Sequence, residues 1–185
     1  MPITNNEVMF NDDQFMLTKT DLKGVITYAN KDFISVSGFS EAELVGSSHN
    51  IVRHPDMPEE AFEDMWRNLK MGRPWTGVVK NRCKNGDHYW VIANATPIIE
   101  NGQTVGYLSA RRKPTRQQIE EAANAYRLFK DGNAKHLVIQ EGKVMKNDLI
   151  SRVKYKLLNC CTITHRLLVM VGVAAVVVAV QAGIG

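Results

Sequence analysis

The chain has 185 residues, of which 44% are apolar and 23% are charged, and its formal net charge is +4. This length and composition suit one folded domain with a modest remainder. A net charge of +4 is too small to predict nucleic-acid binding, and we expect no nucleic-acid partner. The three cysteines suit a reducing compartment and show no metal-ligand spacing: Cys83, Cys160 and Cys161.

The chain is predicted to begin with a flexible segment over residues 1–14, followed by a hairpin. The runs "FMLTKTD" and "GVITYAN" are short and β-prone, and the turn-like residues 21–24 join them. Two short helices follow in "NKDFISVSGF" and "SEAELVG". The second helix has the pattern of a capping box, formed by Ser40 and Glu43, and a glycine stop at Gly46.

Residues 49–58 read "HNIVRHPDMP" and concentrate two histidines, an arginine, an aspartate and two prolines in a predicted loop. The sequence after this loop predicts a helix, because its apolar residues recur at i, i+3, i+4 and i+7: Phe62, Met65, Trp66 and Leu69. We expect Pro58 in the first turn of this helix, Gly72 at its end, and Asp56 as its cap.

Three strands are predicted next, in "PWTGVVKNRC", "HYWVIANATPII" and "QTVGYLSARRK". The dipeptide Asn85-Gly86 joins the first two strands and favours a type I′ turn, and Asn101-Gly102 joins the last two. The order is therefore two strands, several short helices and three strands. This order predicts an α+β domain over residues 15–113, with a five-stranded antiparallel sheet and helices on one face.

From Thr115 the sequence predicts an amphipathic helix over residues 115–129. Thr115 and Gln118 form a second capping box, and one apolar stripe contains four residues: Ile119, Ala122, Tyr126 and Phe129. Residues 114–166 are expected to be a helical and basic linker.

Residues 167–185 contain no charged side chain and reach the ~20 residues of a membrane-spanning helix only marginally. We predict a truncated transmembrane segment here, with a buried core helix as the alternative. Basic residues cluster before the apolar run and none follows it, which places the preceding part in the cytoplasm: Lys143, Lys146, Arg152, Lys154, Lys156 and Arg166.

The residues of "HNIVRHPDMP" alone leave several interpretations open. A histidine beside an aspartate could be a general base, but no nucleophile motif accompanies it. His49 or His54 could hold a haem, although no metal-ligand motif emerges. The structural alternative is a loop stiffened by its prolines, with Asp56 capping a helix and with Arg53 and His54 in solvent.

The order of elements resembles a PAS domain. The strings "HNIVRHPDMP", "AFEDMW" and "PWTGVVKNRCKNGDHYWVIANATPI" look like the FAD-binding PAS domain of bacterial aerotaxis receptors, over about residues 15–113. In that family a linker and a membrane anchor follow the PAS domain, as the sequence indicates here. The family then continues into a HAMP domain and a signalling helix bundle, which these 185 residues do not contain.

The resemblance implies non-covalently bound FAD between the sheet and the helices. It implies ligand-binding roles for Asn30, Arg53, His54 and Asp56. The planar fork of Arg53 would bind the pyrophosphate, and an Arg53→Ala change would lower FAD retention. His54 would add a donor, while Asp56 would fix the loop or reach a ribose hydroxyl.

Trp75 and Asn81 lie six apart on one predicted strand, so their side chains face the same way. If that face is the cleft, Trp75 would stack on or wall the flavin ring and Asn81 would hydrogen-bond its polar edge. The alternatives are core packing for Trp75 and a solvated position for Asn81. Arg111 stands about where related flavin-binding PAS domains carry a glutamine. No cysteine lies in the segment where light-sensing relatives carry a photoreactive one, which favours redox sensing.

The resulting prediction is redox or oxygen sensing for aerotaxis by a membrane-anchored receptor, without enzymatic activity. The receptor would lie in the inner membrane with its PAS domain in the cytoplasm. A homodimer is expected, with chemotaxis signalling components as partners in a full-length receptor. The alternative is a cofactor-free PAS dimerisation module tethered to the membrane, in which the stripe on helix 115–129 is exposed and pairs with a partner.

Overall fold

The structure is a computed structural model that describes residues 3–148, 150–151 and 153. The predicted membrane segment and two of the cysteines, Cys160 and Cys161, lie outside the described residues. Within the described residues, no helix is both long enough and apolar enough to cross a membrane. The chain divides into two compact units, residues 1–144 and residues 145–185, and the first contains the sheet.

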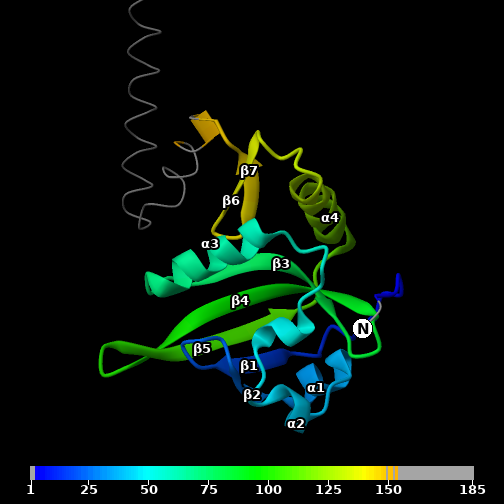
Figure 1. Cartoon of the computed structure of the whole chain (residues 1–185), viewed down its shortest axis with the longest axis vertical. Helices are drawn as coiled ribbons and strands as arrows, with labels where there is room; N and C mark the ends of the chain where they lie inside the picture. The colour runs from blue at the N-terminus through cyan, green and yellow to red at the C-terminus, as the bar shows by residue number, and fades with distance from the viewer. Residues whose placement is uncertain (1–2, 149, 152, 154–185) are drawn as a thin grey trace, which may run out of the picture. The chain divides into compact units, whose positions relative to one another are not determined.

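Five antiparallel strands form one sheet, as predicted, and the structure gives their order as β2-β1-β5-β4-β3 (Figure 1). The strands are β1 (Met16–Thr20), β2 (Ile26–Ala29), β3 (Trp75–Arg82), β4 (His88–Glu100) and β5 (Gln103–Arg112). Strand β5 is central, because it pairs with both β1 and β4. Strand β3 is an edge of the sheet, which leaves its outer backbone open to other segments.

The helices between β2 and β3 lie beside the sheet (Figure 1). They are α1 (Lys31–Ser37), α2 (Glu41–Leu44), the 3₁₀ helix η1 (His49–Val52) and α3 (Glu59–Lys70). The predicted capping box of Ser40 and Glu43 is present. The predicted cap of α3 is wrong: Pro58 is the N-cap and no side chain caps this helix. The Asp56 carboxylate instead accepts a hydrogen bond from Lys80 Nζ at 2.7 Å.

The type I′ geometry lies at a different turn from the one predicted. A type I′ turn needs positive φ at both central residues. Asn101 and Gly102 meet this requirement with φ of 50° and 79°, whereas in the Asn85-Gly86 pair only Gly86 has positive φ, at 98°. The β3–β4 loop is longer than two residues, because Cys83 N donates to Asp87 O at 2.7 Å.

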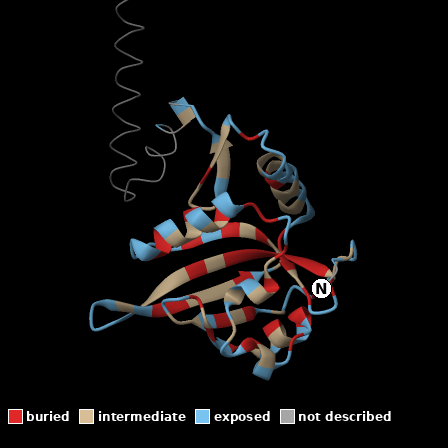
Figure 2. Cartoon of the chain, in the orientation of Figure 1, coloured by how far each residue is buried: buried red, intermediate tan, exposed pale blue. Residues whose placement is uncertain are grey.

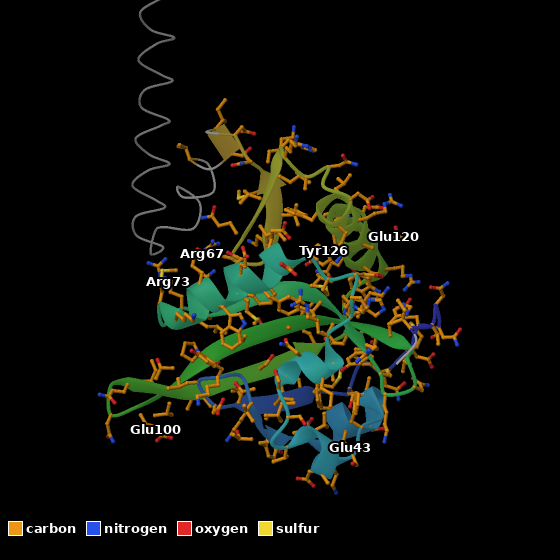
Figure 3. The ribbon with its side chains drawn as sticks, viewed as in Figure 1. Glu43, Arg67, Arg73, Glu100, Glu120 and Tyr126 are labelled. Carbon is orange, nitrogen blue, oxygen red and sulfur yellow. The ribbon has the colours of Figure 1, made fainter. Side chains whose placement is uncertain are left out.

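The segment after β5 is part of the first compact unit rather than only a linker. Helix α4 (Arg116–Lys130) begins with the predicted capping box of Thr115 and Gln118. Its apolar stripe is not exposed, because Tyr126 is buried and Ile119 packs against the core. The Tyr126 hydroxyl donates to Val78 O at 2.6 Å, which attaches α4 to β3 (Figure 3).

A hairpin follows α4 where the sequence predicted only a linker. Strands β6 (Leu137–Gln140) and β7 (Lys143–Lys146) form a separate two-stranded sheet. Glu141 and Gly142 join the strands with φ of 50° and 78°, a turn of type I′ character. Residues 114–166 are therefore not simply helical and basic in their described part.

Strand β4 shows why α4 belongs to the domain. Every residue from His88 to Ala93 is buried, although successive side chains point to opposite faces (Figure 2). The inner face carries Tyr89 and Val91, while Trp90 on the other face lines a pocket with residues of α4. Both faces of β4 are therefore covered at this end of the sheet.

Asn30 holds β1 and α1 together. Its Oδ1 accepts hydrogen bonds from Leu17 N at 2.9 Å and Phe33 N at 3.1 Å, and its Nδ2 donates to Phe15 O at 2.6 Å. The first of these acceptor contacts belongs to β1, and the second caps α1. Each bond satisfies a backbone group that would otherwise need another partner.

The Asn30→Ala change is expected to lower the free energy of unfolding by about 2–3 kcal/mol, the sum of a lost N-cap and two lost backbone contacts. Urea denaturation would measure this difference. The control is Asn124→Ala, an exposed position on α4, which should stay within about 0.5 kcal/mol of the wild type. Equal stability of the two variants would contradict this role for Asn30.

Candidate functional site

A cleft lies between the inner face of the sheet, η1 and α3. It contains about 740 Å³ of empty space, its open mouth included. Small-molecule sites are mostly apolar with a few polar groups, and the lining of this cleft has that character. Three predicted site residues line it, namely Arg53, Trp75 and Asn81. The other three predicted residues are not among its lining residues.

Trp75 forms an apolar wall of the cleft and is 3% exposed. Its Nε1 donates to the buried Asp64 Oδ2 at 2.8 Å, which fixes the ring. The indole lies across Gly77, where a Cβ atom would stand 2.4 Å from Trp75 Cη2. Glycine at this position is therefore required for the ring to lie against its own strand.

Asn81 places an unsatisfied donor in the cleft. It is 4% exposed, and its Nδ2 has no hydrogen-bond partner within the described part of the chain. A buried amide without a partner is unfavourable by about 1–3 kcal/mol. A ligand that accepts a hydrogen bond here would remove that penalty.

Arg53 lies at the cleft because its backbone pairs with β3. Arg53 and Asn81 form an antiparallel bridge, which joins "HNIVRHPDMP" to the edge strand. The Arg53 guanidinium lies 4.2 Å from the centroid of the Phe62 ring on α3. Its Nη2 also approaches Met57 O at 3.5 Å. These contacts hold a half-buried cation without pairing it with a carboxylate.

Arg111 is a second cation in the cleft, and it is 4% exposed. Its Nη1 donates to Thr18 Oγ1 at 3.0 Å and to Ser109 O at 3.2 Å, and its Nη2 lies 2.7 Å from His49 Nε2. The guanidinium also lies 5.0 Å from the centroid of Phe33. These described partners are uncharged, and burial lowers the pKa of Arg111 to about 10.

His49 lines the cleft beside Arg111, whereas the sequence suggested for it only a role as a haem ligand. Burial, followed by the charge of Arg111, lowers the pKa of His49 to about 3. The imidazole is therefore neutral at physiological pH, and its Nε2 accepts the hydrogen bond from Arg111. Positions 49 and 111 lie on separate elements, so no local sequence pattern could have indicated their contact.

His54 and Asp56 point away from the cleft lining. His54 is 1% exposed, its Nδ1 accepts from Asp56 N at 3.1 Å, and its ring lies 5.8 Å from that of His88. Burial, helped by the charge of Lys80, lowers the pKa of His54 to about 4. His54 and Asp56 therefore form no ion pair at neutral pH. Ligand-binding roles for Asn30, His54 and Asp56 stay predictions.

Two neutral histidines, the half-buried His49 and the buried His54, should make the fold sensitive to mild acid. In the unfolded chain a histidine titrates near pH 6.5, whereas His49 and His54 have folded pKa values of about 3 and about 4. Below pH 6.5 the unfolded state binds more protons, so the free energy of unfolding falls as the pH falls. The slope is up to about 1.4 kcal/mol per pH unit for each histidine.

Urea denaturation at about pH 7.5 and about pH 5 would measure this loss. Both pH values lie above the range in which most carboxylates become protonated. A His54→Gln variant should show a smaller difference between the two pH values. The control is His136→Gln, an exposed position, which should keep the wild-type difference. Equal wild-type stability at both pH values would contradict the expectation.

Comparison with known proteins supports the family resemblance. Residues 26–111 match the model of the PAS fold family. The chain is 46% identical over 145 residues to the aerotaxis receptor of Escherichia coli K12, a match that covers 76% of this chain and 29% of that protein. It is 31% identical over 97 residues to a nitrogen fixation regulatory protein of Klebsiella pneumoniae, covering 52% of this chain and 20% of that one.

Solved structures show the same fold. The dark structure of the blue-light photoreceptor Aureochrome1 LOV matches with a TM-score of 0.54 at 18% identity, covering 60% of this chain and 86% of that one. A PAS domain from Colwellia psychrerythraea matches with a TM-score of 0.50 at 29% identity, covering 55% and 87%. The chain spans less than a third of the aerotaxis receptor's length. It contains a PAS domain and is a homologue of the aerotaxis receptor.

Proposed function

We propose that this chain senses the redox state or oxygen supply of the cell through a non-covalently bound FAD. It signals for aerotaxis as part of a membrane-anchored receptor, with the PAS domain in the cytoplasm and the anchor in the inner membrane. The 46% identity to the aerotaxis receptor supports this function, as does the sequence of residues 167–185. The receptor works as a homodimer with chemotaxis signalling components.

The observation that carries the proposal is the chemistry of the cleft. An apolar pocket with the Trp75 wall contains the unsatisfied Asn81 amide and two guanidinium groups that no described carboxylate neutralises. Buried cations are unfavourable unless they meet negative charge. FAD combines an apolar ring system, polar ring edges and an anionic pyrophosphate, so the residues present fit this group.

Each residue has a distinct task in this proposal. Arg53, half-buried and held by Phe62, binds the pyrophosphate with its planar fork. Trp75 excludes water from the apolar part of the cleft, and Asn81 orients the ligand by a hydrogen bond. When bound, FAD supplies reversible electron uptake. Arg111 responds to the accompanying change of charge, because its described partners are uncharged.

The decisive experiment is the absorption spectrum of the purified protein before and after dithionite, with identification of what denaturation releases. Flavin bands that bleach reversibly, and FAD in the supernatant, are expected. A Soret band would instead assign His49 to haem ligation. A colourless protein that stays colourless after incubation with FAD would overturn the proposal and favour the cofactor-free interaction module. The apolar stripe of α4, which that module would use, is however packed against the core.

A further inference from the structure

One buried carboxylate joins the cleft to the hairpin that follows α4. Asp64 on α3 is 1% exposed. Its Oδ1 accepts hydrogen bonds from the Arg67 guanidinium and from Asn68 Nδ2 at 3.3 Å. Its Oδ2 accepts from Trp75 Nε1 at 2.8 Å and from the backbone N–H of Gly142, also at 2.8 Å. One oxygen thus has partners on α3 itself, and the other has partners on two distant segments.

The turn between β6 and β7 is fitted closely to β3. At Gly142, which has φ of 78°, a Cβ atom would lie 2.0 Å from Thr76 O and 3.0 Å from Gly77 Cα. Backbone atoms of an edge strand cannot move aside as a flexible side chain can. The turn therefore contacts β3 directly beside Trp75, and only glycine allows this approach.

Trp75 and Gly142 depend on each other through Asp64. Both donate to the same oxygen, and Arg67 and Asn68 hold the other one. The indole N–H fixes the rotation of the carboxylate, so a displaced indole leaves the carboxylate free to turn toward its α3 partners. The backbone N–H of Gly142 would then lose its acceptor. A buried N–H without an acceptor is unfavourable, which weakens the docking of the turn.

We propose that Asp64 couples the cleft to the β6–β7 hairpin, so that the position of Trp75 sets how firmly the hairpin turn is docked. In the sequence, strand β7 leads directly into the basic segment that precedes residues 167–185. A change in how firmly the turn is docked would therefore act on the segment that follows it. Asp64 is a positioning residue and does not line the cleft. The redox change as the natural trigger rests on the proposed function, whereas the coupling itself does not.

Hydrogen exchange of the peptide that contains Gly142 tests the coupling without any cofactor. Trp75→Phe keeps an aromatic wall but removes the donor to Asp64, and it should speed this exchange at least about tenfold, a typical coupling strength. Asp64→Asn should have a similar effect, because one acceptor oxygen is replaced by a donor. The control is Lys70→Gln, an exposed position on the same helix. It should stay within about twofold of the wild type.

Exchange of peptides from α1 serves as the reference for intact folding in every variant. If only the Gly142 peptide responds to Trp75→Phe, the coupling is supported. If that peptide exchanges within about twofold of the wild type, the inference is overturned. A general increase that includes α1 would also overturn it, because Trp75 would then act on global stability alone.

A second readout uses the flavin and a residue outside the cleft. Coupling free energies are reciprocal, so Gly142→Ala, which undocks the turn, should shift the flavin midpoint potential and remove the difference in hairpin exchange between oxidised and reduced protein. A flavin-loaded wild type with equal hairpin exchange in both redox states would overturn the inference and leave the proposed function intact. A colourless protein would refute the proposed function, and the Trp75→Phe comparison would still decide the coupling.

Discussion

Replacing Arg53 by alanine should weaken FAD binding about 30-fold while leaving the fold in place. Hydrogen bonds to a charged group contribute about 1.5–3 kcal/mol, and 1.4 kcal/mol corresponds to a factor of ten in affinity. The side chain contributes little to the apoprotein, because its described contacts are the Phe62 ring and a long 3.5 Å approach to Met57 O. Fluorescence titration of the FAD-free protein with FAD would give the dissociation constant.

Two further variants distinguish the contribution of the planar Arg53 guanidinium to FAD binding from that of its charge and from the anchoring of the loop. Arg53→Lys keeps the charge and loses the planar fork, so its affinity should lie between those of the wild type and Arg53→Ala. Arg82→Ala removes another arginine that contacts the same segment, through Ile51 O at 3.3 Å, but does not line the cleft. It should bind FAD as the wild type does. An Arg53→Ala protein with wild-type affinity would contradict the assigned role.

Local patterns predicted the parts of the fold that local physics determines. Both capping boxes formed because the four residues concerned satisfy backbone groups within their own first turns. The alternation of β3 correctly placed Trp75 and Asn81 on one face, since side chains repeat every two residues along a strand. That the face is the lining of the cleft could only be seen once the helices had been placed.

The turn at Asn85-Gly86 shows the limit of dipeptide signals. The same residue pair types stand at both hairpin turns of the sheet, yet only Asn101 adopts positive φ. The two-residue loop at Asn101 requires positive φ at both of its residues. In the longer loop at Asn85, of this pair only Gly86 has positive φ. The β6–β7 hairpin had a usable signal, because Glu141-Gly142 separates two short β-prone runs.

The site was predictable only where one segment supplies it. Arg53 could be selected from its own sequence neighbourhood, but its contact with the cleft comes from a backbone bridge to Asn81. His54 and Asp56 follow it directly, and the chain turns at the prolines so that these side chains meet Lys80 and His88 instead. The pair of His49 and Arg111 joins η1 to the central strand, which no spacing rule can show.

Replacing Arg111 by methionine should affect flavin chemistry and apoprotein stability in opposite directions. In the FAD-free protein Arg111 is a buried cation whose described partners are neutral, and an apolar side chain of similar length avoids its desolvation penalty. The free energy of unfolding of the apoprotein should therefore not fall. In the flavin-loaded protein, reduction brings negative charge into the cleft that Arg111 no longer stabilises.

The midpoint potential of the Arg111→Met protein should accordingly become more negative by roughly 60 mV, equivalent to about 1.4 kcal/mol for a one-electron step. The control is Arg112→Met, the next residue of β5, which is exposed and points to the opposite face of the sheet. Spectroelectrochemical titration should find its potential unchanged. If the two variants shifted the potential equally, the effect would be one of net charge and not of the buried guanidinium. A destabilised apoprotein with an unchanged potential would make Arg111 a structural residue, held in place for Thr18 and His49 and not for the ligand.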